Sequence, residues 1–174
     1  MILIKDYDLR LFKPEDLESV MDINLRTLPE NYSSYFYLEL YEHFPKIFLV
    51  AQVDNKIVGY IMCRIEIGGS EFKRTPFGFT RKGHIVSLAV LPESRLHGIG
   101  TALITEAMRG MIEYKASECF LEVRVTNEQA IKIYKELGFQ ALNTIRDYYR
   151  DGEDAFIMAR KLRLSELPDT DKPY

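Results

Sequence analysis

The most constraining feature of this sequence is a strand, turn, helix and strand near its middle. Residues 85–91 are almost all apolar, which is typical of a central strand covered on both faces. Apolar side chains then repeat at helical spacing over residues 96–112, and residues 119–125 alternate as a strand does. Two strands joined by a helix form a right-handed unit with parallel strands. We therefore expect a parallel strand pair inside a sheet that helices cover.

Short strands and helices flank this unit on both sides. Further strands are predicted over residues 8–12, 47–53, 57–65, 140–146 and 155–161. Further helices are predicted after Pro14, within residues 31–44 and after Asn127. This order fits an α/β chain with one mixed sheet and helices on its faces. Residues 66–83 are rich in glycine and basic side chains, and we expect a long solvated loop there.

Composition and charge exclude several classes of protein. A length of 174 residues suits one domain, and 47% hydrophobic with 28% charged residues argues against intrinsic disorder. Neither a membrane-spanning run nor a signal peptide is recognisable, so we expect a cytoplasmic protein. A net charge of −3 argues against binding nucleic acid by bulk charge. Cys63 and Cys119 lack CxxC spacing and are expected to be reduced structural thiols.

The turn before the longest helix carries a possible phosphate site, Arg95-Leu96-His97-Gly98-Ile99-Gly100. Its two glycines let a ligand approach the backbone, where the amides and dipole of a helix N-terminus attract anions. Arg95 and His97 can add positive charge. A plain glycine turn is the alternative, but the position between a buried strand and an amphipathic helix favours phosphate. The spacing matches neither a Walker loop nor a dinucleotide fingerprint.

Several motifs occur in order around this turn. They are Leu-Pro-Glu-Asn-Tyr at 28–32, Gly-His-Ile-Val-Ser-Leu-Ala-Val at 83–90, Glu-Val-Arg-Val-Thr-Asn at 122–127 and Tyr-Tyr-Arg-Asp-Gly-Glu-Asp-Ala at 148–155. With the R-x-x-G-x-G turn, they make the chain resemble the GNAT acetyltransferase superfamily over roughly residues 8–162. The local motifs resemble those of amino-terminal acetyltransferases, of the archaeal RimI-like type and the related catalytic subunit of the eukaryotic NatA complex.

The resemblance implies a definite fold. It is a mixed, mostly antiparallel seven-stranded sheet with about four helices and a splayed central parallel strand pair, forming one domain over residues 1–164. The polar tail over residues 165–174 carries two prolines and is predicted to be flexible.

The resemblance also implies a reaction and a cosubstrate. The family transfers acetyl from acetyl-CoA to the α-amino group of protein N-termini, by direct attack in a ternary complex. Pyrophosphate would lie on the backbone of Arg95, Leu96, His97, Gly98, Ile99, Gly100 and Thr101. Pantetheine would lie along Leu88, Ala89 and Val90, with Asn127 and Tyr134 facing it and the thioester. His97 departs from the Arg or Lys of many relatives, which weakens phosphate attraction when the ring is neutral.

Acetyl transfer needs a base for the amine proton and a proton for the departing thiolate. The resemblance implies that His84 takes the amine proton directly or through water; a histidine hydrogen-bonded at a strand edge is the alternative. The Leu-Pro-Glu-Asn-Tyr match implies that Glu30 holds the amine or accepts its proton. Tyr134 could protonate the thiolate, and it also fits a core aromatic. Which of Glu30 and His84 is the main base stays open.

The acceptor groove is predicted to use Leu28, Pro29, Tyr32, Tyr148 and Tyr149, since tyrosines combine an apolar body with a polar tip. Other charged side chains are expected to be solvated, namely Arg124, Lys73, Arg74, Arg81 and Lys82.

Predicted partners are protein or peptide N-termini, with the ribosome as a candidate. No membrane, direct nucleic-acid role or metal is expected, and the need for an auxiliary subunit stays open. A GNAT enzyme acting on lysine side chains or small amines is the alternative. A non-catalytic acyl-CoA-binding module is a third hypothesis, which loss of the phosphate turn, Glu30 or His84 would favour; all are present.

Overall fold

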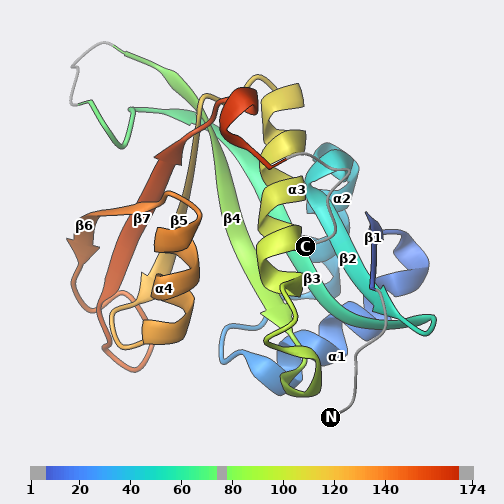
Figure 1. The fold of residues 1–174 in the computed structure, drawn as a ribbon. Coiled ribbons are helices and arrows are strands. Elements are labelled where there is room, and N and C mark those ends of the chain that lie inside the picture. The colour runs from blue at the N-terminus through green and yellow to red at the C-terminus, as the bar shows by residue number, and fades with distance from the viewer. Residues whose placement is uncertain (1–6, 74–77, 169–174) are drawn as a thin grey trace. The chain divides into compact units, whose positions relative to one another are not determined.

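The structure is a computed structural model that describes residues 7–73 and 78–168. It contains a seven-stranded sheet in the order β1-β2-β3-β4-β5-β7-β6 (Figure 1). The strands are β1 (Asp8–Leu11), β2 (Phe48–Val53), β3 (Lys56–Gly68), β4 (Thr80–Val90), β5 (Glu118–Arg124), β6 (Gln140–Ile145) and β7 (Ala155–Lys161). The α-helices of the described residues are α1 (Leu17–Thr27), α2 (Ser34–His43), α3 (Ile99–Glu113) and α4 (Glu128–Glu136). The predicted α/β class and mixed sheet are confirmed.

The described residues form two compact units. The first holds residues up to 64, residues 85–110 and residues 167–168; the second holds residues 65–84 and 111–166, apart from the four residues 74–77. Both β3 and β4 therefore begin in one unit and end in the other.

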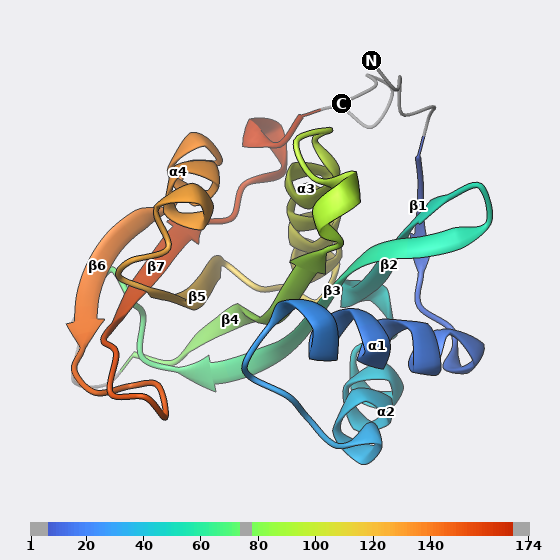
Figure 2. The same cartoon turned by 90° about the horizontal axis from the view of Figure 1, so that it is seen from below.

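The first unit is a layered structure built on β1, β2 and β3. The buried strand β2 lies between β1 and β3 and pairs antiparallel with both. Figure 2 shows α3 on one face of this part of the sheet and α1 and α2 on the other. The ring of Phe12, directly after β1, stacks on that of Phe48 at 4.0 Å between centroids and so fixes the end of β1 to β2.

Helix α3 packs closely through a glycine. A Cβ at Gly110 would lie 2.5 Å from the carbonyl oxygen of Lys46 and 2.7 Å from Ile47 Cγ2. Only a residue without a side chain allows this approach, which lets the Pro45–Ile47 turn lie directly against α3.

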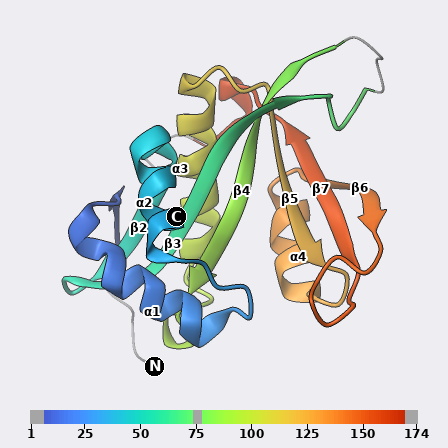
Figure 3. The same ribbon diagram turned by 180° about the vertical axis from the view of Figure 1, so that it is seen from behind.

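The second unit is centred on β5. Strand β5 pairs parallel with the start of β4 and antiparallel with β7, and β7 pairs antiparallel with the edge strand β6. Figure 3 shows β5, β7 and β6 side by side with α4 against them. The β4–β5 ladder covers only Lys82 to His84 and Glu118 to Phe120, although β4 continues to Val90 and β5 to Arg124. A short ladder of this kind is what a splayed parallel pair requires.

The predicted loop over residues 66–83 is wrong at both ends. Strand β3 continues to Gly68 and β4 starts at Thr80, so residues 66–68 and 80–83 are strand. Gly83 misled the prediction because glycine usually marks a loop. Here a Cβ would lie 2.2 Å from Met111 Sδ, so a glycine inside the sheet makes room for this methionine of α3. Arg74 lies outside the described residues.

The predicted flexible tail over residues 165–174 is described only as far as residue 168. A 3-10 turn spans Leu164–Glu166, and Leu167 is buried. Residues 169–174 lie outside the described part of the chain.

Candidate active site

The predicted phosphate turn lies in the first unit, between β4 and α3. A 3-10 turn over Pro92–Ser94 leads into it, and helical bonding starts where the Ala102 amide donates to the Gly98 carbonyl at 2.9 Å. Gly98 has φ of +80°, a conformation that glycine adopts without strain. Leu96 shares it at +67° and is almost fully exposed. At Gly98 and Gly100 the turn therefore presents backbone and helix N-terminal amides, because neither residue carries a side chain.

Gly100 gives this turn its openness. It is the second residue of α3, and a Cβ built on it would have no described atom within 4 Å. Nothing in the fold itself requires glycine here, unlike Gly98 with its positive φ or Gly110 with its close packing. The space beside Gly100 is thus available for a ligand to reach the amides of the first helical turn.

The predicted pantetheine strand is the part of β4 that precedes this turn. Leu88 and Val90 are half-buried on one face, while Ala89 is buried on the other. Arg95 does not point away from the strand, because its Nε donates to the Val90 carbonyl at 2.8 Å. Arg95 therefore ties the turn to the end of β4 in addition to any attraction for phosphate.

The segment that carries Glu30 is held by a buried asparagine that the sequence analysis missed. Asn24, on α1, donates through Nδ2 to the Glu30 carbonyl and to Tyr60 Oη, both at 3.0 Å. Its Oδ1 accepts from Asn31 Nδ2 at 2.8 Å. Tyr60 Oη in turn lies 2.7 Å from Ser87 Oγ on β4. The backbone at Glu30 is therefore fixed to three elements of the same unit.

Three tyrosines, Tyr32, Tyr37 and Tyr60, belong to the same unit as Asn24, and Tyr60 is hydrogen-bonded to it. Tyr32 stacks on Phe36 at 5.0 Å between ring centroids and lies edge-on to Tyr37. Burial raises the pKa of Tyr60 and that of Tyr37 above the usual range of phenols, so both remain neutral near pH 7. Leu28 is half-buried and Pro29 is exposed at the start of the same segment.

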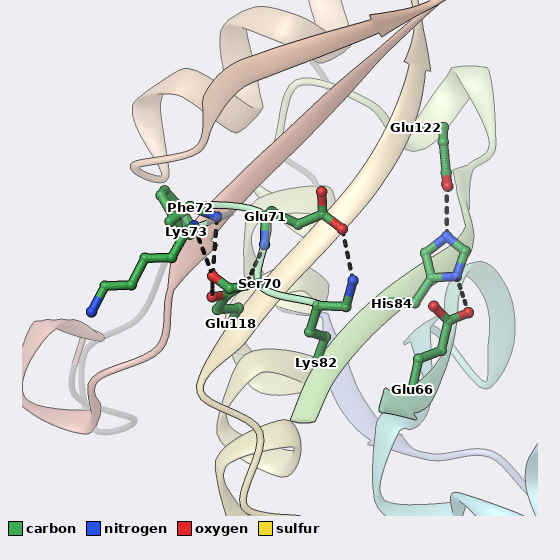
Figure 4. Close-up of polar contacts among 9 residues, drawn as sticks. All are labelled: Glu66, Ser70, Glu71, Phe72, Lys73, Lys82, His84, Glu118 and Glu122. Carbon is green, nitrogen blue, oxygen red and sulfur yellow. Dashed lines mark hydrogen bonds and ion pairs between the residues drawn. The ribbon is translucent and has the colours of Figure 1, made fainter. Parts of the chain in front are cut away.

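His84 lies in the second unit, between two carboxylates (Figure 4). Its Nε2 is 2.7 Å from Glu122 Oε2, and its Nδ1 is 3.1 Å from Glu66 Oε1. The ring also stacks on Phe120 at 4.4 Å, which fixes its plane. A neutral imidazole can donate to only one of the two carboxylates, whereas an imidazolium donates to both. The arrangement can therefore accept a proton on the ring and hold it between two anions.

Glu66 and Glu122 are neighbours of His84 that the sequence analysis did not single out. The sequence predicts a loop at Glu66, but this residue belongs to β3. Glu122 follows Phe120 by two residues, and Phe120 is the register partner of His84 in β5. The alternation of β5 was visible in the sequence; the register that brings Glu122 beside His84 was not.

Lys82, Ser70 and Glu71, close to His84, pair with one another and with Glu118 instead of facing solvent (Figure 4). Lys82 is buried, with Nζ 2.7 Å from Glu71 Oε1 and 4.7 Å from the centroid of the Phe120 ring. Glu118 accepts from Ser70 Oγ and from the Glu71 amide. The expectation of a solvated Lys82 is wrong, because the carboxylate that pairs with it comes from a segment whose fold could not be predicted. Lys73 is exposed.

Asn127 directly precedes α4 and Tyr134 lies on it, both in the second unit. Asn127 caps the helix, with its Oδ1 accepting from the Ala130 amide at 3.2 Å, as its position in the sequence predicted. Tyr134 is buried, with its ring 5.7 Å from that of Phe139. Both residues thus have structural roles, which are compatible with the predicted contacts to acetyl-CoA.

Tyr148 and Tyr149 lie in the loop between β6 and β7. Tyr148 is exposed and Tyr149 is half-buried, with their rings edge-to-face at 4.9 Å. Arg124, which was expected to be solvated, instead contacts this loop: its guanidinium carbon is 4.0 Å from the centroid of the Tyr149 ring.

The structure divides the predicted site residues between the two units. The first contains the phosphate turn, the pantetheine strand and the segment of Glu30; the second contains His84, Asn127, Tyr134, Tyr148 and Tyr149.

Among the described residues, no group of three or more histidine, cysteine or acidic side chains is placed to bind a metal ion. None of the helices within residues 7–73 and 78–168 has the length and apolar character needed to cross a membrane. Cys63 and Cys119 are buried free thiols.

Comparisons with known proteins agree with this architecture. The model of the acetyltransferase (GNAT) family matches residues 17–139. An N-alpha-acetyltransferase of Sulfurisphaera tokodaii is 48% identical over 91% of this chain and 95% of its own length. One from Saccharolobus solfataricus is 47% identical over the same shares. The crystal structure of Ard1 from Thermoplasma volcanium superposes with a TM-score of 0.76 at 31% identity, covering 90% of this chain and 98% of that one.

Proposed function

The chain belongs to the GNAT acetyltransferase family, and we propose that it is a protein N-alpha-acetyltransferase. It transfers the acetyl group of acetyl-CoA to the α-amino group of protein N-termini. The observation that carries this proposal is the 48% identity to an archaeal N-alpha-acetyltransferase over 91% of the chain. GNAT enzymes use acetyl-CoA as the acetyl donor, and the residues predicted to bind it are all present.

Acetyl-CoA is proposed to bind through its pyrophosphate at the turn from Arg95 to Thr101. The openness at Gly100 and the positive φ of Gly98 support this placement, because both leave backbone amides accessible. The pantetheine arm lies along Leu88, Ala89 and Val90 and faces Asn127 and Tyr134. The Val90 carbonyl already accepts one hydrogen bond, from Arg95.

The reaction proceeds by direct attack within a ternary complex. The amine nitrogen forms a bond to the thioester carbonyl carbon, the carbon–sulfur bond breaks, and the CoA thiolate leaves. The amine must lose a proton and the thiolate must gain one. A free α-amino group has a pKa near 8, so a modest base suffices for the first step. Tyr134 is the proposed donor to the thiolate.

Glu30 and His84 are the proposed bases, acting as two routes for the proton of the same amine. Asn24 fixes the backbone at Glu30, which gives that carboxylate a defined position. Both ring nitrogens of His84 face carboxylates, so the proton is proposed to reach the ring through water or through one of these carboxylates rather than directly; Glu66 and Glu122 then stabilise the imidazolium. Loss of one route leaves the other, so each single variant retains part of the rate.

The acceptor peptide is proposed to lie against Leu28, Pro29, Tyr32, Tyr148 and Tyr149. The enzyme acts as one domain over residues 1–164 in the cytoplasm, on protein or peptide N-termini, with the ribosome as the candidate site of encounter. It requires no metal, because the base, the acid and the electrostatic groups are all supplied by side chains and backbone.

Steady-state turnover of acetyl-CoA on a matched pair of peptides tests the proposal. One peptide has a free α-amino group and no lysine; the other has the same sequence with a blocked α-amino group and one internal lysine. We expect turnover on the first and little on the second. Turnover on the second alone would establish the alternative, an enzyme that acetylates lysine side chains.

A further inference from the structure

Arg124 occupies the end of β5, next to the loop that joins β6 and β7. Its register partner is Ala155, the first residue of β7, so the loop returns to the sheet beside it. Only a fifth of its side chain is exposed. The contacts that cover Arg124 come from this loop.

The guanidinium contacts the loop along its edge and on its face. At the edge, Nη1 donates to Asp151, 2.8 Å from Oδ2, and to Glu153 Oε2 at 2.7 Å. On the face, the guanidinium carbon lies 4.0 Å from the centroid of the Tyr149 ring. A planar cation can stack its face on an aromatic ring while its edge binds two carboxylates. An ammonium has no planar face to stack, although Lys82 shows that it can lie over a ring and pair with a carboxylate.

The backbone of the loop is arranged around these contacts. The Gly152 amide donates to the Tyr149 carbonyl at 2.8 Å, and the Tyr149 amide donates to the Glu153 carbonyl at 3.1 Å. Gly152 has φ of +86°, which closes the turn. Thr126, two residues after Arg124, donates to the other oxygen of the Glu153 carboxylate. Both carboxylates are thus held in place.

The charges of this cluster persist at neutral pH. Hydrogen bonding lowers the pKa of Asp151, mainly through the Glu153 amide, and that of Glu153, mainly through Thr126, with Arg124 contributing to both. Both carboxylates are therefore ionised when they face Arg124. The cluster thus contains one cation, Arg124, and two anions, Asp151 and Glu153.

We propose that Arg124 is a positioning residue for the acceptor peptide: it holds the ring of Tyr149, and through it Tyr148, in the orientation that binds the peptide. The inference rests on the proposed function, which assigns the two tyrosines to the acceptor. Tyr148 packs edge-to-face on Tyr149 at 4.9 Å, so a change at Arg124 passes to the exposed ring. Arg124 acts through Tyr149.

The test compares R124K with the unmodified enzyme. Lysine keeps the charge but loses the planar stack on the Tyr149 ring. Ordering the loosened ring on binding costs at most the free energy of one cation–π contact, so the peptide KM should rise by up to roughly 30-fold. The acetyl-CoA KM and kcat at saturating peptide are expected to change less than about 2-fold, because Arg124 acts on acceptor binding alone. R163K, at an exposed arginine paired with Glu166, is the matched control.

A double-mutant cycle shows whether Arg124 works through Tyr149. Y149L removes the aromatic face that Arg124 contacts and should raise the peptide KM. If Arg124 acts through the ring, R124K combined with Y149L should be no worse than Y149L alone. Fully multiplicative effects, or a peptide KM unchanged in R124K, would overturn the inference.

Hydrogen exchange of residues 147–154 gives a readout that does not depend on activity. R124K should speed exchange in this loop, where the Tyr149, Gly152 and Glu153 amides are hydrogen-bonded, and leave α3 unchanged. Unchanged loop exchange would also overturn the inference. Failure of the unmodified protein to acetylate peptide α-amines is a different result: it would refute the proposed function, and with it the peptide-positioning role, even if R124K loosens the loop.

Discussion

Replacing Gly100 should lower the affinity for acetyl-CoA without lowering the stability of the free protein. A Cβ at this position would enter open space, so a side chain there should cost the free protein nothing in packing. The same side chain would occupy the space through which a pyrophosphate reaches the first turn of α3. G100L should therefore fold normally and bind acetyl-CoA weakly.

The expected magnitudes follow from the local structure. A hydrogen bond to a charged group contributes about 1.5–3 kcal/mol, so losing one amide–phosphate bond weakens binding by roughly 10- to 100-fold. Replacing glycine by a good helix former adds up to about 1 kcal/mol of stability inside a helix. That gain corresponds to a rise in Tm of up to about 4 °C for a chain of this size.

Two variants of the same helix act as controls. G100A adds only a methyl group, so it should gain stability while losing less affinity than G100L. G110A also adds only a methyl group, but its Cβ would lie 2.5 Å from the Lys46 carbonyl oxygen. Overpacking of this kind costs about 1–3 kcal/mol, so G110A should lower Tm instead. Gly98 is a poorer choice, because its φ of +80° strains any replacement.

The measurements are isothermal titration calorimetry with acetyl-CoA and thermal unfolding of the free proteins. Unchanged acetyl-CoA affinity in a G100L protein of normal Tm would refute the placement of pyrophosphate at this turn. A Tm that falls in G100L as it does in G110A would show that the space beside Gly100 is not open.

Two further predictions concern the proton and the pH dependence of stability. The double variant E30Q/H84F should lose at least about 10²-fold in kcat, and more than either single variant, because two routes for one proton are removed; near-normal kcat in a folded double variant would reject both residues as the base. Hydrogen bonding from Arg10 lowers the pKa of Asp16, so the stability that this carboxylate contributes is present above about pH 4 and is lost as pH falls through its folded pKa. D16N should therefore be less stable by roughly 1–2 kcal/mol at pH 7 and show a weaker loss of stability on acidification, measured by urea unfolding between pH 2 and pH 7; an unchanged acid profile would contradict this account.

Local signals in the sequence were sufficient for much of the fold. Ser33 caps α2 by accepting from the Phe36 amide, and Asn127 caps α4, both as expected from the preference of these side chains for helix starts. Gly138 ends the region of α4 with φ of +83°. Such features depend on residues a few positions apart, so the sequence displays them directly.

Contacts between distant segments were not predictable in the same way. The sequence predicts a solvated Lys82 because it shows the charge of this residue but does not identify Glu71 as its partner. Arg124 was assigned to solvent for the same reason, since its partners lie 25 or more residues further along the chain. The environment of His84 likewise depends on the register of β4 against β5. In each case the residue type was informative, but the pairing required the fold.

The central claim is that the enzyme acetylates α-amino groups. Its most direct test is a competition within one peptide that has both a free α-amino group and an internal lysine. After limited turnover with acetyl-CoA, tandem mass spectrometry locates the acetyl group by fragmentation. The account predicts acetylation at the N-terminal nitrogen and little on the lysine. Acetyl found mainly on the lysine Nζ, or on neither nitrogen while acetyl-CoA binds normally, would contradict it.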